Sequence, residues 1–290
     1  MMSEVIEKAK NLEELSRFLS DLNKQKKSHI GFCGEKVEDI YQTLKEDFVG
    51  DDGDITFLLA RNNLGEIVAA IGVDIDETSA EVWGPFNQTS SVQLQHRLWA
   101  QLKNENPTVK DFYFFINKEN TAQQLFMEEL KAQKSGEHLI LEIKEQNHER
   151  VREIKSTSFR QDDFQAFEKL HNNAFPQTYY DAKTITKRLG NECILKVLKN
   201  EANELQGYAY FEIDTEMEEA SLEYIAISPN AQNQGLGTML LREVLTEMFS
   251  YSQIKDIRLC IDNSNNQANH VYISAGFEPK HLLISYHLKH

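Results

Sequence analysis

The sequence predicts an α/β protein made of two tandem domains of the same kind, each a mixed, mostly antiparallel sheet flanked by helices. Two observations support this prediction. The chain has 290 residues, nearly twice the roughly 150 residues of an ordinary domain. One order of elements also occurs twice: a β-hairpin, an amphipathic helix, a strand, a second helix and a final strand. A doubly wound nucleotide-binding fold would instead alternate strands and helices throughout.

The first copy begins with a hairpin at residues 65–76 and 80–86, where β-rich runs flank a short polar turn. A helix follows, because apolar side chains recur at helical spacing at Leu94, Leu98, Trp99 and Leu102. We expect a strand, a helix and a final strand at residues 111–116, 121–133 and 138–143.

The second copy repeats this order, with its hairpin at residues 206–214 and 220–228. The apolar residues of its first helix are spaced by one, three and four positions, namely Leu236, Leu240, Leu241, Val244, Leu245 and Met248. The remaining strand, helix and strand are expected at residues 256–261, 266–275 and 282–287. Because residues 144–150 are polar, we place the boundary there and expect domains at residues 1–147 and 148–290.

Charge and composition limit the partners. With 31 Lys plus Arg against 46 Asp plus Glu, the net charge is −15, which repels nucleic acid and anionic membranes. Three widely spaced cysteines and no signal-peptide pattern favour a cytoplasmic protein, which we expect to be a monomer or homodimer. The nine histidines show no metal-ligand spacing, so no metal is expected, and His281, His287 and His290 are interpreted as strand and tail residues.

Chemistry is predicted where the strand that ends near Pro229 leads into the second copy's first helix. Gly235 and Gly237 lie at the start of that helix. The first N–H groups of a helix lack intrahelical partners, and the helix dipole favours negative charge there. A pyrophosphate is therefore the expected ligand. The Lys of a P-loop is absent and the dinucleotide fingerprint is incomplete, although ATP or NAD at this helix start is a weaker alternative.

Two motifs resemble those of a known family. Gln232-Asn233-Gln234-Gly235-Leu236-Gly237 resembles the Gln/Arg-x-x-Gly-x-Gly/Ala acetyl-CoA signature of the GNAT superfamily of N-acetyltransferases. Residues 265–277 resemble the family's Asn-x-x-Ala-x-x-x-Tyr-x-x-x-Gly-Phe segment. The resemblance implies an N-acetyltransferase that uses acetyl-CoA as co-substrate and acts on a primary amine of a small molecule or peptide. O-acetyl transfer and transfer of a longer acyl chain stay open.

The resemblance also implies roles for individual residues. The pantetheine arm would pair with the backbone of Ile225, Ala226 and Ile227. Asn265 would contact the coenzyme, and Tyr272 would act as general acid near its sulfur. The pyrophosphate would be bound by the backbone N–H groups of Gln232, Asn233, Gln234, Gly235, Leu236, Gly237 and Thr238. As alternatives, Asn265 is a helix N-cap and Tyr272 a half-buried core aromatic.

The general base and the acceptor site are less specified. Glu223 is the first candidate base and Glu212 the second, and Glu223 as a solvated charge is the alternative. Some family members have a glutamate on the later strand, where this chain has Cys260, interpreted as a buried small residue. The expected acceptor residues either line a site for a cationic amine or pack the loop and hairpin, namely Phe175, Tyr179, Tyr180 and Glu212.

The first domain departs from the motif. No glycine occurs at residues 87–91, and Phe126 takes the place of the tyrosine. We therefore interpret residues 1–147 as a degenerate copy that binds no coenzyme and serves as scaffold, part of the acceptor cleft or dimer surface. For the whole chain, the alternative to an enzyme is a non-catalytic (acyl-)CoA-binding sensor or scaffold, which would keep the glycine turn without needing Tyr272 as an acid.

Overall fold

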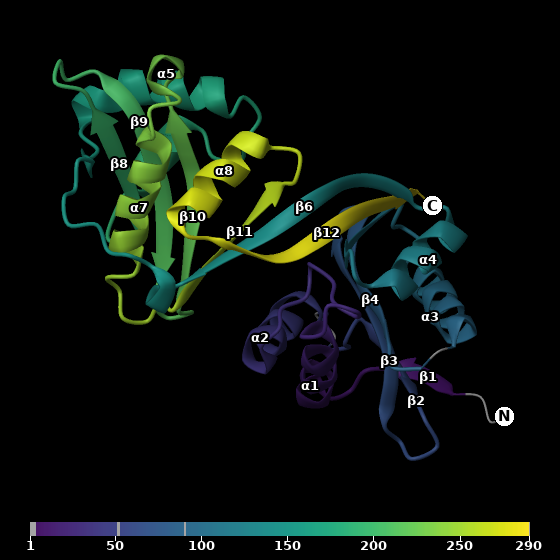
Figure 1. The fold of residues 1–290 in the computed structure, drawn as a ribbon. Helices are drawn as coiled ribbons and strands as arrows, with labels where there is room; N and C mark the ends of the chain where they lie inside the picture. The colour runs from purple at the N-terminus through teal and green to yellow at the C-terminus, as the bar shows by residue number, and fades with distance from the viewer. Residues whose placement is uncertain (1–3, 51–52, 90, 290) are drawn as a thin grey trace. The chain divides into compact units, whose positions relative to one another are not determined.

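The computed structural model describes residues 4–50, 53–89 and 91–289 (Figure 1). The strands form an eight-stranded sheet in the order β1-β2-β3-β4-β5-β12-β6-β11 and a four-stranded sheet in the order β10-β9-β8-β7. The chain forms two compact units. Unit 1 contains the described residues up to His138 and those from His281 onward, and unit 2 is Leu139–Lys280. Each unit has its own core.

Unit 1 is a sheet with helices on both faces (Figure 1). Strand β2 shows why: Phe57 and Leu59 pack with α1 and α2, whereas Leu58 and Ala60 pack with α3. A strand buried on both faces is apolar throughout rather than alternating. The elements of unit 1 are β1 (Val5–Lys8), α1 (Leu12–Asn23), α2 (Val37–Asp47), β2 (Phe57–Arg61), β3 (Ile67–Asp76), β4 (Ser79–Asn87), α3 (Val92–Glu105), β5 (Asp111–Asn117) and α4 (Thr121–Leu130).

Unit 2 is also covered on both faces. Along β9, Ala209 and Phe211 pack in the core that contains α7, whereas Tyr208 and Tyr210 pack with α5 and α6. Among the helices of the described residues, none has the length and apolar character needed to cross a bilayer. The elements are η1 (Glu145–Asn147), β7 (Thr157–Ser158), η2 (Gln161–Asp163), α5 (Phe164–Ala174), α6 (Ala182–Arg188), β8 (Cys193–Lys199), β9 (Leu205–Asp214), β10 (Glu219–Ile227), η3 (Pro229–Ala231), α7 (Leu236–Met248), β11 (Asp256–Asp262) and α8 (Asn266–Ala275).

The predicted fold class is confirmed, because each copy contains the expected hairpin, helices and strands. The helix expected at residues 121–133 ends earlier, at Leu130. Lys131 has a left-handed backbone (φ 60°) that cannot continue the helix, and β6 (Gln133–Lys144) begins two residues later.

From the sequence we expect the final strand of each copy to complete the sheet of that copy, with one domain boundary between residues 147 and 148. In the structure, the final strand of each copy lies beside a strand of the other copy. Strand β5 of the first copy pairs antiparallel with β12 (Glu278–Lys289), and β11 of the second copy is next to β6. The units accordingly divide at 138/139 and at 280/281. Two copies of one fold can exchange an equivalent strand. The hydrophobic pattern of such a strand is the same in either sheet, so it does not predict which copy the strand joins.

Glu243 of α7 fixes the start of the second GNAT-like copy. Its side chain is 2% exposed. Its two carboxylate oxygens accept hydrogen bonds from the backbone N–H groups of Lys155 and Ser156, each at 2.9 Å. These bonds tie the segment that leads into β7 to the helix whose N-terminus carries the glycine turn.

We predict that Glu243→Ala lowers the free energy of unfolding by about 2 to 4 kcal/mol, because two amides lose a charged acceptor in a buried place. Glu243→Gln keeps one acceptor and should cost less. Urea denaturation checks both values. Glu247→Ala on the same helix is the control, since its ion pair with Lys196 is partly exposed and should be worth under about 1 kcal/mol. Equal losses for Glu243→Ala and the control would contradict the assignment.

Candidate active site

The site begins with an open strand edge. Within the described residues, β10 pairs with β9 but not with β11, which belongs to the other sheet. The Ser228 N–H bonds to Gln206 O at 2.8 Å, so alternation along the antiparallel pair directs the backbone groups of Ile227 and Ile225 to the open edge. The same alternation turns the amide of Ala226 toward β9. The Ile227 carbonyl accepts a hydrogen bond from the Gln232 side chain at 3.1 Å. The other backbone groups at this edge can pair with the amides of an extended ligand.

Glu223 lies at an irregularity of the same strand. The register of β10 on β9 shifts by one residue between Leu222 and Tyr224, so Glu223 is the extra residue of a β-bulge. Bulges re-aim side chains and are frequent beside active sites. Glu223 and Ile225 consequently line the same cavity.

That cavity lies between β10, β11 and α8 and encloses about 550 Å³. It contains nine of the residues that the sequence predicts for the site. They are Phe175, Glu223, Ile225, Ala226, Ile227, Gln232, Gly237, Asn265 and Tyr272.

A second cavity of about 620 Å³ surrounds the glycine turn. It is lined by Asn233, Gly235, Leu236 and Thr238 and shares Ile227, Gln232 and Gly237 with the first. Because the two share these walls, they are adjoining parts of one groove. We call it the β10–α8 groove, and it runs from the start of α7 to Tyr272.

The turn itself has the predicted anion-binding features. Gly235 is the N-cap of α7 with φ 77°, and no side chain caps this helix. The first N–H with a helical acceptor is that of Met239, which bonds to Gly235 O at 3.0 Å. A Cβ on Gly235 would have no heavy atom within 4 Å, so its left-handed backbone, not crowding, explains the glycine. The uncapped helix start faces the groove with its positive dipole end.

Helix α8 supplies the opposite wall. Asn265 is its N-cap, with the side-chain oxygen accepting from the Ala268 N–H at 3.0 Å, and it also lines the cavity. Tyr272 packs edge-on against Phe277, with ring centroids 5.6 Å apart. Burial raises the pKa of Tyr272 to about 12. This phenol is therefore protonated at neutral pH and can act as a donor.

Three of the predicted acceptor residues belong to the loop between α5 and α6. Phe175 lines the cavity, and the Tyr179 hydroxyl donates a hydrogen bond to Glu223 Oε2. The Tyr180 ring lies outside the cavity under the guanidinium of Arg188, 4.5 Å from its centroid. Among these predicted aromatics, only Phe175 contributes to the wall.

The side chains of three other residues considered in the sequence analysis do not line the groove. Glu212 is paired with Arg188 at 2.8 Å and accepts from the Tyr210 hydroxyl at 2.5 Å. The Gln234 side chain donates to Asn230 O at 3.3 Å. Cys260 is exposed, so its interpretation as a buried residue is wrong: it lies on the outward alternation of β11.

In unit 1 the corresponding region is filled by its own side chains. Helices α4 and α8 begin at Thr121 and Asn266, 145 positions apart, and Asn120 caps α4 as Asn265 caps α8. Gln123 then takes the place of Ala268. Its amide is buried and donates to Pro85 O at 2.7 Å.

Strand β4 shows the same contrast. It begins 140 positions before β10, at Ser79 and Glu219, and each has one bulge, so Pro85 corresponds to Ile225. Pro85 has no N–H to offer. The Ser91 side chain accepts from the Leu94 N–H at 3.2 Å and caps α3, whereas α7 has no such cap.

The helix alignment corrects one sequence assignment. Counting 145 positions back from Tyr272 gives Met127, so the residue at the tyrosine position is Met127 and not Phe126. From the start of the preceding strand to this position both copies span 16 positions, Asp111 to Met127 and Asp256 to Tyr272, so the sequence comparison placed the residue one position too early. Both residues are buried apolar side chains, and neither can donate a proton.

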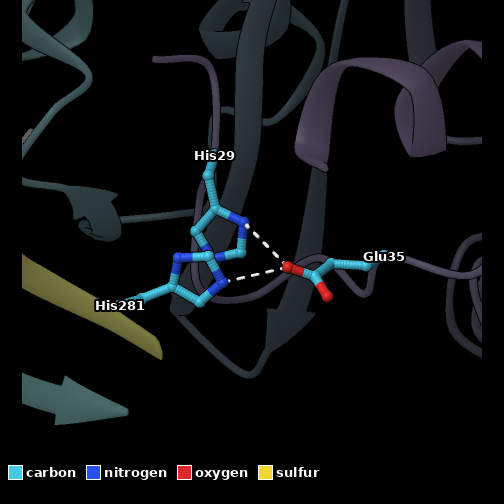
Figure 2. A group of neighbouring side chains, drawn as sticks. All are labelled: His29, Glu35 and His281. Atoms are coloured by element: carbon cyan, nitrogen blue, oxygen red, sulfur yellow. Dashed lines mark hydrogen bonds and ion pairs between the residues drawn. The ribbon is translucent and has the colours of Figure 1, made fainter. Parts of the chain in front are cut away.

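Unit 1 also contains a cluster that the sequence did not predict, namely His29, Glu35 and His281 (Figure 2). The two buried imidazoles are stacked, with centroids 3.8 Å apart and planes 10° apart. His281 Nε2 donates to Glu35 Oε1 at 2.9 Å. The three residues are brought together from segments 246 positions apart, so no spacing could reveal them.

The geometry of this cluster does not suit one metal ion. A metal binds a histidine along an in-plane lone pair, and two nearly parallel stacked rings cannot direct their lone pairs at one point. His281 Nδ1 also faces the Asn117 amide nitrogen at 3.0 Å, whose orientation is set by the Glu119 N–H on Asn117 Oδ1 at 2.9 Å. Nδ1 is thus an acceptor and Nε2 carries the proton. The cluster fastens the start of β12 to unit 1. Of the other histidines, His287 lies in β12, whereas His290 lies outside the described residues.

Sequence reasoning missed several residues that line the groove, namely Ala174, Ile261, Asp262, Gln267, Ala268 and Val271. Alternation along β11 places Ile261 beside the cavity. Val271 and Gln267 lie four residues apart on α8, as do Tyr272 and Ala268, so helical periodicity from Tyr272 could have indicated this wall.

The comparisons with known proteins agree with this geometry. Residues 148–277 match the profile of the acetyltransferase (GNAT) family. A comparison with curated protein sequences gave no match. Several solved structures resemble nearly the whole chain, among them the following three. A GCN5-related N-acetyltransferase from Sphaerobacter thermophilus has a TM-score of 0.70 and 14% identity, covering 99% of this chain and 95% of that one.

The second is a tandem GNAT protein from the clavulanic acid biosynthesis pathway, with a TM-score of 0.61, 11% identity, and coverage of 99% and 98%. The third, a GNAT-family acetyltransferase from Colwellia psychrerythraea, has a TM-score of 0.53, 14% identity, and coverage of 98% and 100%. At these identities the likeness establishes the fold. The whole-chain match to a tandem protein confirms the prediction of two GNAT-like copies.

The two glycines of the turn should respond oppositely to alanine. Gly235→Ala should lower the free energy of unfolding by about 1 to 2 kcal/mol, because alanine is strained at φ 77°. Gly237 lies in the first turn of α7 without a positive φ, so Gly237→Ala should raise it by about 0.5 to 1 kcal/mol. Urea denaturation of the full chain measures both. Destabilisation by Gly237→Ala as large as that by Gly235→Ala would contradict the conformational explanation.

Proposed function

We propose, from the premise that residues 148–277 are a GNAT acyltransferase domain, that this chain transfers the acetyl group of acetyl-CoA to a primary amine of a small molecule or peptide. The observation that carries the proposal is the β10–α8 groove. It joins an uncapped helix start to an open strand edge and ends between a carboxylate and a buried phenol.

The groove fits an acyl-CoA in three respects. The free N–H groups at the start of α7 suit a diphosphate, so residues Gln232 to Thr238 would bind it. The edge of β10 at Ile225 and Ile227 suits the two amides of a pantetheine arm. Asn265 lies on the facing wall and would contact the coenzyme. When bound, acetyl-CoA supplies the activated thioester carbonyl.

The chain's own residues would transfer two protons, one from the amine and one to the sulfur. An amine with a pKa of about 10.4 costs about 4 to 5 kcal/mol to deprotonate at pH 7. Glu223 lines the end of the groove and would accept that proton. The Tyr272 hydroxyl would return a proton to the sulfur. With a pKa of about 12 against about 8.5 for a thiol, that transfer is uphill by about 5 kcal/mol, so it must accompany cleavage of the C–S bond.

The acceptor end has a negative character. Among the residues that line the cavity, the ionisable carboxylates are Glu223 and Asp262, and no Lys or Arg is present. A cationic amine is therefore favoured there by charge. Phe175 offers an apolar contact for the carbon skeleton of the acceptor.

Coenzyme binding should occur once per chain. We expect isothermal titration with acetyl-CoA to give one site. In unit 1 the Gln123 side chain binds Pro85 O and the Ser91 side chain caps α3, whereas in unit 2 no side chain caps α7. Gly237→Ala should weaken binding about tenfold, which is about 1.4 kcal/mol. Its added Cβ would make ordinary contacts with Ile227 and Val271, at 3.5 and 3.7 Å, but it would lie in the groove where the ligand must fit.

Gly34→Ala is the matched control for this titration, because its Cβ would make an ordinary 3.6 Å contact with Ile40 in unit 1. Two sites per chain, or equal affinity for Gly237→Ala and Gly34→Ala, would contradict the assigned groove.

Tyr272→Phe should slow thiol release from acetyl-CoA in the presence of an amine panel by about 10²-fold, as expected for loss of a general acid. Binding of acetyl-CoA should change less than about twofold, because the ring remains. The hydroxyl-removal control is Tyr251→Phe, whose hydroxyl contacts Asn191 O at 3.4 Å outside the cavity. Binding without turnover of any acceptor would instead favour a non-catalytic acyl-CoA sensor or scaffold.

A further inference from the structure

The loop between α5 and α6, residues 175–181, is fixed by three consecutive residues. Thr178 Oγ1 lies 2.5 Å from the Tyr224 hydroxyl. The Tyr179 hydroxyl donates to Glu223 Oε2. The carbonyl of Tyr180 accepts from His171 Nε2 at 2.8 Å. Two of these bonds end on neighbouring residues of β10, at its bulge.

His171 is the internal support of this loop. Its side chain is fully buried (0% exposed). A carbonyl can only accept, so Nε2 carries the proton, and Nδ1 accepts from the Tyr208 hydroxyl at 2.6 Å in the neutral ring. Burial lowers the pKa of His171, which keeps this neutral form at pH 7. The ring thereby joins β9 to the loop residue next to Tyr179.

We propose that Tyr179 is a positioning residue for Glu223, and that His171 sets Tyr179 in place, so that the α5–α6 loop orients the carboxylate that receives the acceptor's proton. This inference rests on the proposed function. Tyr179 holds Oε2 of Glu223 and leaves Oε1 to accept from the amine. A held carboxylate loses less rotational freedom when the amine arrives.

The alternative is that Tyr179 only packs on the loop or stacks on the acceptor. Its ring lies 4.5 Å from the Tyr180 ring by centroids, yet the residue is 72% exposed. Packing alone would not need the hydroxyl. The pKa of Tyr179 is raised, by partial burial first and by its bond to Glu223 second, which agrees with a phenol that remains protonated beside a carboxylate.

The pairing can be measured without coenzyme or acceptor. Ionisation of tyrosines is followed by near-ultraviolet difference absorbance upward from about pH 9.5, where an ordinary phenol begins to titrate. Glu223→Gln should move one phenol to lower pH than in wild type, because Tyr179 loses its anionic partner while its partial burial remains. Tyr179→Phe should lack this phenol. Identical titration curves for wild type and Glu223→Gln would overturn the pairing.

The support from His171 is tested by hydrogen exchange of residues 175–181. His171→Leu should speed exchange there at least about tenfold relative to wild type, since both hydrogen bonds of the ring are lost. His171→Gln can donate to Tyr180 and accept from Tyr208, so its exchange rate at residues 175–181 should stay within about threefold of wild type. This variant controls for a general effect of replacing the buried ring. Unchanged exchange in His171→Leu would overturn this part of the proposal.

The role in turnover is read from kcat and KM measured separately. Tyr179→Phe removes the hydrogen-bond donor that holds Glu223 Oε2. Because the carboxylate is then less well oriented, kcat should fall by more than KM rises.

Tyr113→Phe removes an exposed phenol hydroxyl in unit 1 and should leave both constants unchanged. An unchanged kcat in Tyr179→Phe, with coenzyme binding intact, overturns the positioning role and leaves the proposed function standing. Absence of any turnover in wild type overturns the proposed function and this role together, while the tyrosine titration still decides whether the pair exists.

Discussion

The unpaired edge of β10 is the constraint on which the rest of unit 2 depends. Backbone N–H and C=O groups are costly to bury without partners. A strand edge must therefore pair with another strand, form hydrogen bonds to side chains, or stay accessible to solvent or a ligand. Here β10 and β11 lie in different sheets, and a groove separates them. The uncapped start of α7 lies at one end of that groove. The fold thus leaves N–H groups of the β10 edge and of the α7 start along one groove, which suits an extended ligand with an anionic end.

Unit 1 meets the same constraint by closing the gap. A glutamine at position 123 places an amide on Pro85 O, where unit 2 has the small Ala268 facing Ile225. Ser91 caps the helix that Gly235 leaves open. These are local substitutions on one architecture, since α4 and α8 have the same length and the same type of cap. Strand pairing differs as well, since β4 pairs with β5 at Ser79–Glu81, whereas β10 and β11 lie in different sheets. In unit 1 the gap is therefore closed both by backbone pairing and by side chains.

The sequence predicted those features whose physical cause is local. Gly235 is needed by a positive φ within its own turn, and the residues of α7 follow helical periodicity, so both were visible. Tertiary partners could not be predicted. Glu212 forms an ion pair with Arg188, 24 positions away, and the α5–α6 loop accepts a hydrogen bond from the buried His171. Exchange of β6 and β12 was also hidden, because two similar strands present the same alternating pattern to either sheet.

The bulge at Glu223 links the two halves of the groove. Without the extra residue, side chains beyond it would change faces, because strand residues alternate. Tyr224 then could not point into the core where it meets Thr178 while Ile225 and Ile227 face the open edge. One inserted residue thus lets consecutive side chains serve different purposes: Glu223 lines the groove and Tyr224 contacts the α5–α6 loop. The same irregularity sets the register of the open strand edge and the position of the loop contact, so neither can shift without the other.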